Sequence, residues 1–289
     1  MSTTDIPIPV ARLVRELSVD ERTEYERDGA AVVRGVIPLE WVEALSAAVD
    51  RLMVASGMPA VDFAAGDGPR FFSLLYSSMF DPVIKAWGGQ GPLVELARQV
   101  LPETTRLNFY LDQIFAREKG ATKVTPFHQD LPYMPLSGTQ IIRFWVPLDS
   151  VDVDNGAVQY LKGSHRGPVY RARSFDQTNP VASTYDGAEE FEPLPDFAAQ
   201  YDRHDWLIGV CEPGDVLLHH PRTVHGSPPN VAIRRRRGLA TMYTGDDVRY
   251  APRATSAAAN TALTGHVPRP DLAPGDPIDC ELFPRVWTA

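Results

Sequence analysis

From about residue 101 to residue 250, the sequence alternates short β-rich runs with turns built from Gly, Pro and Asp. The runs lie at 106–116, 140–147, 157–161, 208–211, 215–219 and 237–243. Several short strands separated by turns predict a sandwich or a barrel. A jelly roll is one such closed architecture, and it is the fold class that we expect for this part of the chain.

The first hundred residues have a different pattern, which predicts helices with some strand. Residues 18–29 predict a short helix, with Ser18 as its N-cap and Glu21 three residues further on. Apolar side chains at helical spacing predict a second helix over 38–53. A further helix is expected over 82–100 and a strand over 30–36. The expected architecture is therefore mainly β with flanking helices.

We expect a single domain over residues 1–289, because one β-rich domain can reach this length. Its helical N-terminal part would extend over about 1–100 and its jelly-roll core over about 101–250. Residues 164–205 are rich in Pro, Asp and aromatic residues. They predict a long insertion, of a kind that is usually functional or disordered. The tail from residue 250 is expected to be mostly irregular.

The charge balance argues against several classes of partner. Asp and Glu number 37 against 28 Lys and Arg, for a formal net charge of -9. Such an acidic surface disfavours nucleic acid and anionic membranes. No run is apolar for long enough to cross a bilayer, and the first residues lack the order of a signal peptide. The two cysteines, Cys211 and Cys280, do not form a disulfide framework and suit a reducing cytoplasm.

One group of residues points to metal chemistry. His128-Gln129-Asp130 is followed much later by His225 and then by Arg236. Two imidazoles and one carboxylate are the ligand set of a non-haem Fe(II) oxygenase, which leaves the opposite face of the metal open. On a strand, His128 and Asp130 would project to the same face. Arg236 suits a dicarboxylate co-substrate that must be gripped at its far end.

Taken alone, a His-x-Asp triplet is common by chance and describes a turn aspartate beside a satisfied histidine. The motifs around it favour a function. They are, in order, Trp145-Val146-Pro147-Leu148, Asn155-Gly156, Gly163-Ser164-His165, Gly214-Asp215, His225-Gly226-Ser227 with Asn230, and Arg235-Arg236. In this order the chain resembles the phytanoyl-CoA dioxygenase family of Fe(II)- and 2-oxoglutarate-dependent oxygenases. The resemblance extends from about residue 20 to the end and is densest at 125–165 and 213–247.

The resemblance implies both a fold and a metal site. The family fold is a double-stranded β-helix, a cupin-like jelly roll with flanking helices, which agrees with the strand pattern. Arg236 would pair with the distal carboxylate of 2-oxoglutarate, and Arg235 or Arg237 would replace it if the register were shifted by one. The implied ligands of Fe(II) are His128, Asp130 and His225.

The resemblance also implies a pocket for the co-substrate. Ser227 would be the hydroxyl that assists the arginine, Trp145 would lie in the pocket, and Gln113 would line it. Candidate substrate contacts are Tyr133, Arg143 and Trp206. Tyr133, Met134, Phe144 and the aromatics of the insertion (Phe175, Tyr185 and Trp206) could form an apolar lid, although core packing is the simpler interpretation of each.

Two of these interpretations leave alternatives open. Arg143 could meet an anionic substrate or could be a surface arginine. His219 and His220 are expected to serve strand packing, with inward contact near the metal as the less favoured alternative.

The expected function is that of a hydroxylase that uses Fe(II), 2-oxoglutarate and O₂. It would oxidise a small organic metabolite, such as a biosynthetic intermediate, and release succinate and CO₂. Asp130 favours hydroxylation over halogenation, because related halogenases have Gly or Ala at this position. Two alternatives remain: a catalytically idle jelly-roll binding or sensor protein, and a metal hydrolase on the same scaffold. Neither explains why Arg236 and Ser227 accompany the metal ligands.

Overall fold

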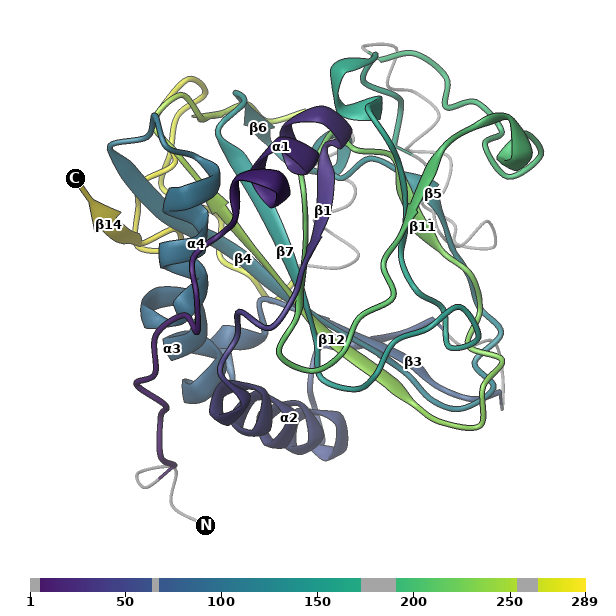
Figure 1. Ribbon diagram of the computed structural model, residues 1–289. Helices are drawn as coiled ribbons and strands as arrows, with labels where there is room; N and C mark the ends of the chain where they lie inside the picture. The colour runs from purple at the N-terminus through teal and green to yellow at the C-terminus, as the bar shows by residue number, and fades with distance from the viewer. Residues whose placement is uncertain (1–5, 64–67, 173–190, 254–264) are drawn as a thin grey trace.

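The computed structural model describes residues 6–63, 68–172, 191–253 and 265–289. Two antiparallel sheets organise it (Figure 1). The larger has the strand order β1-β10-β7-β12-β4-β3-β2, with β14 also paired to β4, and the smaller has the order β5-β11-β8-β9. This arrangement, with helices packed on the larger sheet, confirms the expected class, mainly β with flanking helices.

The larger sheet consists of β1 (Ala30–Val33), β2 (Val61–Asp62), β3 (Phe71–Leu75), β4 (Arg106–Arg117), β7 (Ile141–Pro147), β10 (Val216–His219), β12 (Arg236–Thr244) and β14 (Arg285–Thr288). The smaller consists of β5 (Thr125–His128), β8 (Gln159–Leu161), β9 (Trp206–Ile208) and β11 (His225–Ser227). A separate short pair is formed by β6 (Leu136–Ser137) and β13 (Arg249–Tyr250).

The α-helices of the described residues all precede the long strand β4. They are α1 (Val19–Asp28), α2 (Leu39–Val54), α3 (Pro82–Gln90) and α4 (Pro92–Val100). The predicted capping box of α1 is confirmed, because Ser18 and Glu21 each accept a hydrogen bond from the other's backbone N–H. Among these described residues, no helix is both long enough and apolar enough to cross a membrane.

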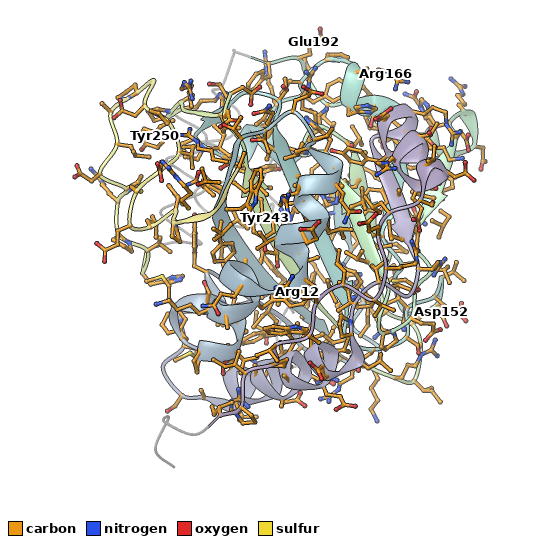
Figure 2. The ribbon with its side chains drawn as sticks, turned by 60° about the vertical axis from the view of Figure 1, so that its left-hand side comes forward. Arg12, Asp152, Arg166, Glu192, Tyr243 and Tyr250 are labelled. Atoms are coloured by element: carbon orange, nitrogen blue, oxygen red, sulfur yellow. The ribbon has the colours of Figure 1, made fainter. Side chains whose placement is uncertain are left out.

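The helices α2, α3 and α4 share one apolar core with the larger sheet. Trp41 of α2 and Trp87 of α3 are packed against each other, with ring centroids 5.3 Å apart. Tyr243 of β12, labelled near the centre of the molecule in Figure 2, belongs to this core and donates a hydrogen bond from its hydroxyl to Gly88 O (2.9 Å). The helices thus cover one face of the larger sheet and leave the other face for the smaller sheet.

The helix predicted over 82–100 is in fact two helices. Gly91 ends α3 and begins α4 in an extended conformation (φ −72°, ψ 173°). A Cβ atom at Gly91 would lie 2.4 Å from Trp87 O, so this tight junction needs glycine. Pro92 has no N–H to continue the helix and disfavours helical angles in the residue before it. The continuous helix was therefore a wrong prediction, although the Gly-Pro signal was present.

Strand β7 contributes side chains to both the core under the helices and the opposite face of the larger sheet. All of its residues are buried. Ile142, Phe144 and Val146 belong to the core under the helices. Arg143 and Trp145 alternate with them and line a cavity on the opposite face. Phe144 therefore packs in the core and is not part of a lid.

Several predicted boundaries were wrong. The strand expected over 30–36 ends at Val33, and that expected over 208–211 is β9, which begins at Trp206. The short strands β2, β3 and β14 were missed. β14 lies in the tail expected to be irregular, and it exists because it pairs with β4.

Part of the expected insertion is described. Residues 164–172 and 191–205 contain the 3₁₀ turns Ser164–Arg166 and Tyr201–Arg203. Residues 173–190, with Phe175 and Tyr185, lie outside the described residues.

Candidate active site

Three candidate metal ligands converge between the two sheets. His128 ends β5 and His225 begins β11, and the antiparallel pairing of these strands places the two residues directly opposite each other. Asp130 Oδ1 lies 3.6 Å from His128 Nε2 and 3.8 Å from His225 Nε2. The three side chains are buried, and one ligand atom from each lies within 4.8 Å of the others. A single metal ion could bridge atoms at this spacing.

Asp130 reaches this point by a turn and not along a strand. β5 ends at His128, and Asp130 has helical backbone angles (φ −74°, ψ −39°) just before the 3₁₀ turn Leu131–Tyr133. Its N–H donates to Pro221 O (2.8 Å). The buried side chain of Gln129 ties the turn to neighbouring loops by hydrogen bonds. The expectation that His128 and Asp130 share a strand face was therefore wrong, although their side chains meet.

The backbone sets the tautomer of both candidate histidine ligands. His128 Nδ1 lies 2.9 Å from Pro126 O, and His225 Nδ1 lies 3.0 Å from Thr223 O. A carbonyl oxygen can only accept, so each Nδ1 carries the proton and each Nε2 keeps its lone pair. Burial, with His128 close by, holds the pKa of His225 well below its usual range. The neutral imidazole that a metal requires is thus the favoured form of His225.

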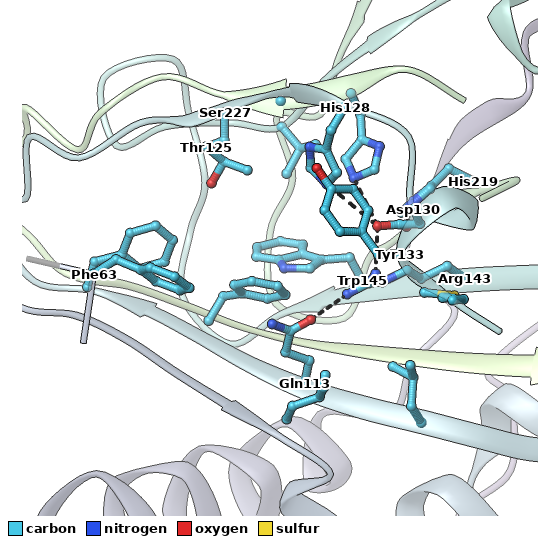
Figure 3. Close-up of a pocket in the computed structure, with 18 of the residues that line it drawn as sticks. Phe63, Gln113, Thr125, His128, Asp130, Tyr133, Arg143, Trp145, His219 and Ser227 are labelled. Carbon is cyan, nitrogen blue, oxygen red and sulfur yellow. Dashed lines mark hydrogen bonds and ion pairs between the residues drawn. The ribbon is translucent and has the colours of Figure 1, made fainter. Parts of the chain in front are cut away.

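Asp130 is held by two further side chains. Arg143 Nη1 lies 2.8 Å from its Oδ1, and His219 Nε2 lies 3.1 Å from its Oδ2. Burial alone would raise the pKa of Asp130, but Arg143, His225 and other nearby donors outweigh it and hold that pKa well below the usual range. Arg143 is oriented in turn by Gln113, whose Oε1 accepts a hydrogen bond from Arg143 Nη2 (2.9 Å). Figure 3 shows this chain of contacts from Gln113 to Asp130.

His219 corrects an expectation. We expected strand packing to be its role, yet its imidazole faces the cavity and contacts a candidate metal ligand. The signal was strand alternation: Leu218 lies in the core under the helices, so His219 must point to the other face. His220 keeps a local role, with Nε2 3.2 Å from Thr139 O.

Arg236 is a buried cation in the same cavity. Its side chain is 4% exposed, and it makes no hydrogen bond or ion pair with any residue of the described ranges. Its guanidinium lies over the Trp145 ring, 4.7 Å from the centroid. Burial lowers the pKa of Arg236 to about 10, so it stays positively charged near neutral pH. A buried charge of this kind favours binding an anion.

The other members of the arginine run have partners of their own. Arg235 pairs with Asp50 at the surface, and Arg237 pairs with Asp149 at 2.7 Å. Arg234 forms an ion pair with Asp152. Arg236 is therefore the member of the run that lines the cavity.

Gly238 makes room for the tryptophan under Arg236. A Cβ atom at Gly238 would lie 1.9 Å from the Trp145 indole, a separation that real side chains do not tolerate. Gly238 and Arg236 are two residues apart on β12 and share its cavity face. On the cavity side of β12, the sequence Arg236-Arg237-Gly238 thus provides a positive charge and, two residues later, space for the Trp145 ring.

The cavity itself is large and mostly apolar. It has about 1330 Å³ of empty space with its open mouth included, and both sheets line it. Its polar end carries the three candidate ligands and Arg236. Tyr133 contacts the edge of the His128 ring, with centroids 5.9 Å apart (Figure 3). The aromatic walls are formed by Phe63, Phe71, Tyr76, Tyr110, Phe115 and Tyr133. Apolar walls with a few polar groups are typical of sites for small organic molecules.

Ser227 has partners other than the one implied. Its hydroxyl donates to Gly156 O (2.6 Å) and accepts from Arg117 Nη1 (2.9 Å). It lines the cavity near Arg236 without a hydrogen bond to it. Arg117, which the sequence analysis did not select, pairs with Arg236 in the register of β4 and β12 and fixes this hydroxyl.

Trp206 is the predicted site residue that the structure does not bring to the cavity. Its ring stacks on Phe127 and Tyr201, with centroids 4.6 Å and 4.9 Å away. It is not part of the cavity wall of the described residues. Side chains along β8 alternate between the cavity and the outer face of the smaller sheet. Leu161 points to the outer face, and so does Trp206, which pairs with it.

The donor set fits the groups that the motifs imply. Two imidazole nitrogens with lone pairs and one carboxylate oxygen suit Fe(II) and leave open positions. The unpartnered guanidinium of Arg236 suits the distal carboxylate of a 2-oxoacid. Both features come from side chains that already lie in one cavity.

Comparisons with known proteins agree with this geometry. The sequence model of the phytanoyl-CoA dioxygenase family matches residues 25–238. A probable alpha-ketoglutarate-dependent hypophosphite dioxygenase of Stutzerimonas stutzeri is 31% identical over 176 residues, which cover 60% of this chain and 55% of that protein. A probable phytanoyl-CoA dioxygenase of Caenorhabditis elegans is 22% identical over 250 residues, which cover 80% of this chain and 77% of that protein. The chain thus spans about half the length of the first relative.

A solved structure has the same fold. The non-heme alpha ketoglutarate dependent carbocyclase SnoK from nogalamycin biosynthesis superposes with a TM-score of 0.70 at 23% identity. The superposition covers 93% of this chain and 96% of that chain. This likeness confirms the expected jelly-roll class.

Proposed function

The chain belongs to the phytanoyl-CoA dioxygenase family, and on that premise we propose that it is an Fe(II)- and 2-oxoglutarate-dependent oxygenase of a small organic metabolite. The observation that carries the proposal is one cavity with two features. His128, Asp130 and His225 offer three ligand atoms to one metal ion. Arg236 offers a charged guanidinium with no hydrogen-bond or ion-pair partner among the described residues.

Different residues would bind the metal and the co-substrate. His128 and His225 would hold Fe(II) through Nε2, and Asp130 would hold it through Oδ1. Iron bound there, with 2-oxoglutarate and O₂, would supply the oxidising chemistry, which yields succinate and CO₂ and oxidises the substrate. Arg236 would pair with the distal carboxylate of 2-oxoglutarate, supported from below by the Trp145 ring.

The neighbours of Asp130 would keep its carboxylate in one orientation. Arg143 contacts the oxygen that faces the two histidines, and His219 contacts the other. Hydrogen bonds to ligand carboxylates tune and orient metal sites in this way. Gln113 extends the support to the wall of the cavity.

The cavity favours a small and largely apolar substrate. Its walls are mainly apolar, with several aromatic side chains, and Tyr133 lies next to the candidate ligand His128. We propose Tyr133 as a substrate contact and Arg143 as a second contact for an oxygen-bearing group near the metal. The solved relative from nogalamycin biosynthesis supports a biosynthetic intermediate as the class of substrate. Hydroxylation is the proposed outcome, since Asp130 occupies the carboxylate position.

Two alternatives make different predictions. An idle binding or sensor protein would not turn over 2-oxoglutarate. A metal hydrolase would need the metal but not the 2-oxoacid. The buried charge of Arg236 favours the oxygenase, because neither alternative needs a cation to bind the distal carboxylate of 2-oxoglutarate.

The free thiols Cys211 and Cys280 support a cytoplasmic location, where cysteines stay reduced. The net charge of -9 supports a small-molecule partner and not nucleic acid.

Anaerobic titration of the protein with Fe(II) and 2-oxoglutarate tests the proposal. A weak visible metal-to-ligand charge-transfer band should form only when both are present. Iron binding without the band would contradict the co-substrate assignment and favour another metal chemistry. Failure to bind either would favour the idle relative.

A further inference from the structure

Tyr160 is a cavity residue to which neither the motifs nor the chemistry above gives a role. It lies in the middle of β8, its side chain is 0% exposed, and it lines the cavity. Its hydroxyl has no hydrogen-bond partner among the described residues. Tyr243 is equally buried, yet its hydroxyl donates to Gly88 O at 2.9 Å. Buried tyrosine hydroxyls usually find such a partner, so the one missing for Tyr160 points to a ligand.

The register of the smaller sheet places Tyr160 beside the metal site. Tyr160 lies directly opposite His225 in the antiparallel pair of β8 and β11. Residues opposite each other in such a pair project to the same face. The Tyr160 ring is stacked near His225, with centroids 5.8 Å apart, and lies 5.1 Å from the His219 ring. Its side chain therefore lines the cavity next to the candidate ligands.

Arg236 supplies the second unpartnered donor. Its Nε is buried and has no partner in the described ranges. Both groups line the same cavity, and the charge of Arg236 partly opposes the rise in the Tyr160 pKa that burial causes. Burial still raises that pKa well above the usual range, so the phenol stays protonated and can donate. One cavity thus contains two buried donors that make no hydrogen bond with any described residue.

The hydroxyl that the resemblance implied is already engaged. Ser227 donates its proton to Gly156 O and accepts from Arg117. A serine has one proton to donate, so Ser227 cannot donate to a ligand while it keeps the bond to Gly156. Tyr160 has no such commitment.

We propose that Tyr160 donates a hydrogen bond to the distal carboxylate of 2-oxoglutarate, beside Arg236. Arg236 would supply the charge and Tyr160 a directed neutral donor, and together they would complete the site for that carboxylate. This inference rests on the proposed function, since it names a further residue of the same co-substrate site.

The test compares two ligands on two proteins. Tyr160→Phe removes the hydroxyl and keeps the ring that packs against His225 and His219. Binding of 2-oxoglutarate and of 2-oxopentanoate, which lacks the distal carboxylate, is measured anaerobically by calorimetry on metal-loaded wild type and variant. We expect 2-oxoglutarate to bind the variant roughly ten- to a hundredfold more weakly, as for a hydrogen bond to a charged group. Binding of 2-oxopentanoate should not change. Tyr25→Phe, which removes a hydroxyl from helix α1 away from the cavity, should leave both affinities unchanged.

The outcomes separate this inference from the function on which it rests. Equal affinity of wild type and Tyr160→Phe for 2-oxoglutarate would overturn it. An equal loss for both ligands would also overturn it, because the hydroxyl or the ring would then act away from the distal carboxylate. Unchanged binding of 2-oxopentanoate shows in addition that the variant site is folded. If metal-loaded wild type bound no 2-oxoglutarate, the proposed function itself would fail.

Discussion

Arg143 Nη1 lies 2.8 Å from Asp130 Oδ1, the same carboxylate oxygen that faces Nε2 of both His128 and His225. Both members of this ion pair are buried. A metal ion at the triad would share that oxygen with the guanidinium. The positive charge of Arg143 and that of a metal therefore act on the same carboxylate.

This relationship predicts how Arg143→Met behaves. Removing one partner of a buried ion pair leaves an uncompensated charge and costs about 3–5 kcal/mol. We expect the metal-free variant to lose stability of this order and a divalent cation to restore much of it. Urea unfolding with and without metal measures both effects. The control Arg34→Met breaks the ion pair between Asp215 and Arg34, whose side chain is exposed. It should lower the free energy of unfolding by no more than about 1 kcal/mol.

Either His128→Ala or His225→Ala should abolish stoichiometric Fe(II) binding and turnover. Each removes one Nε2 whose lone pair is directed by a backbone carbonyl. Metal content after anaerobic loading and desalting gives the readout. The control His204→Ala changes a histidine that lies outside the cavity, and this variant should bind iron as wild type does. Normal iron content in His128→Ala or His225→Ala would remove that residue from the ligand set.

Arg236→Ala should weaken 2-oxoglutarate binding strongly. Loss of a buried, hydrogen-bonded charge partner costs about 2–5 kcal/mol, or roughly thirtyfold or more in affinity. Arg235→Ala should have little effect, because Arg235 pairs with Asp50 at the surface. Titration of each variant with 2-oxoglutarate decides between them. A large loss in Arg235→Ala alone would show that the arginine assignment is wrong by one residue.

Gly238→Ala should impair the same site indirectly. The new methyl group would collide with the Trp145 indole, 1.9 Å from its nearest atom, and the indole supports Arg236. Overpacking of this kind costs about 1–3 kcal/mol. We expect a lower unfolding midpoint together with weaker 2-oxoglutarate binding and unchanged iron stoichiometry. A variant with wild-type affinity would show that Trp145 does not position the guanidinium.

The stability of the metal-free protein should fall as the pH is lowered from about 6.5 towards 4. Burial lowers the pKa of His220 from 6.5 to about 4. In this window the unfolded chain binds a proton at His220 and the folded protein does not, so protonation favours unfolding. Urea midpoints at several pH values measure the slope. His220→Asn should reduce the slope, and an unchanged slope in that variant would assign the effect to other groups.

Some features could be predicted because they depend on neighbours in the sequence. The capping box of Ser18 and Glu21 joins residues three apart, and the strand at 237–243 was visible as a short β-rich run. The junction at Gly91-Pro92 carried a local signal as well, but the prediction of one continuous helix over 82–100 did not use it. The group His128, Asp130, His225 and Arg236 was recognisable from residue types and motif order.

Other features depend on pairings between distant strands. Arg143 could have faced an anionic substrate or solvent, and the register of β7 with β10 decided that it meets Asp130 beside His219. Trp206 was expected in the pocket, and its place on β9 turns it away. These outcomes have no local signature, since a shift of one residue in register moves every side chain to the opposite face.

The sequence by itself determined which chemical groups the chain can bring to a site: two imidazoles, a carboxylate and an arginine, in a chain of short β-rich runs. Only the tertiary structure decided which of several arginines, histidines and hydroxyls meet there. It left the Arg236 guanidinium without a hydrogen-bond or ion-pair partner among the described residues, engaged Ser227 with Gly156, and placed Tyr160 opposite His225. The physical reason is that local structure follows from short-range chemistry, whereas cavity contacts follow from the packing of two sheets whose strands lie far apart in the chain.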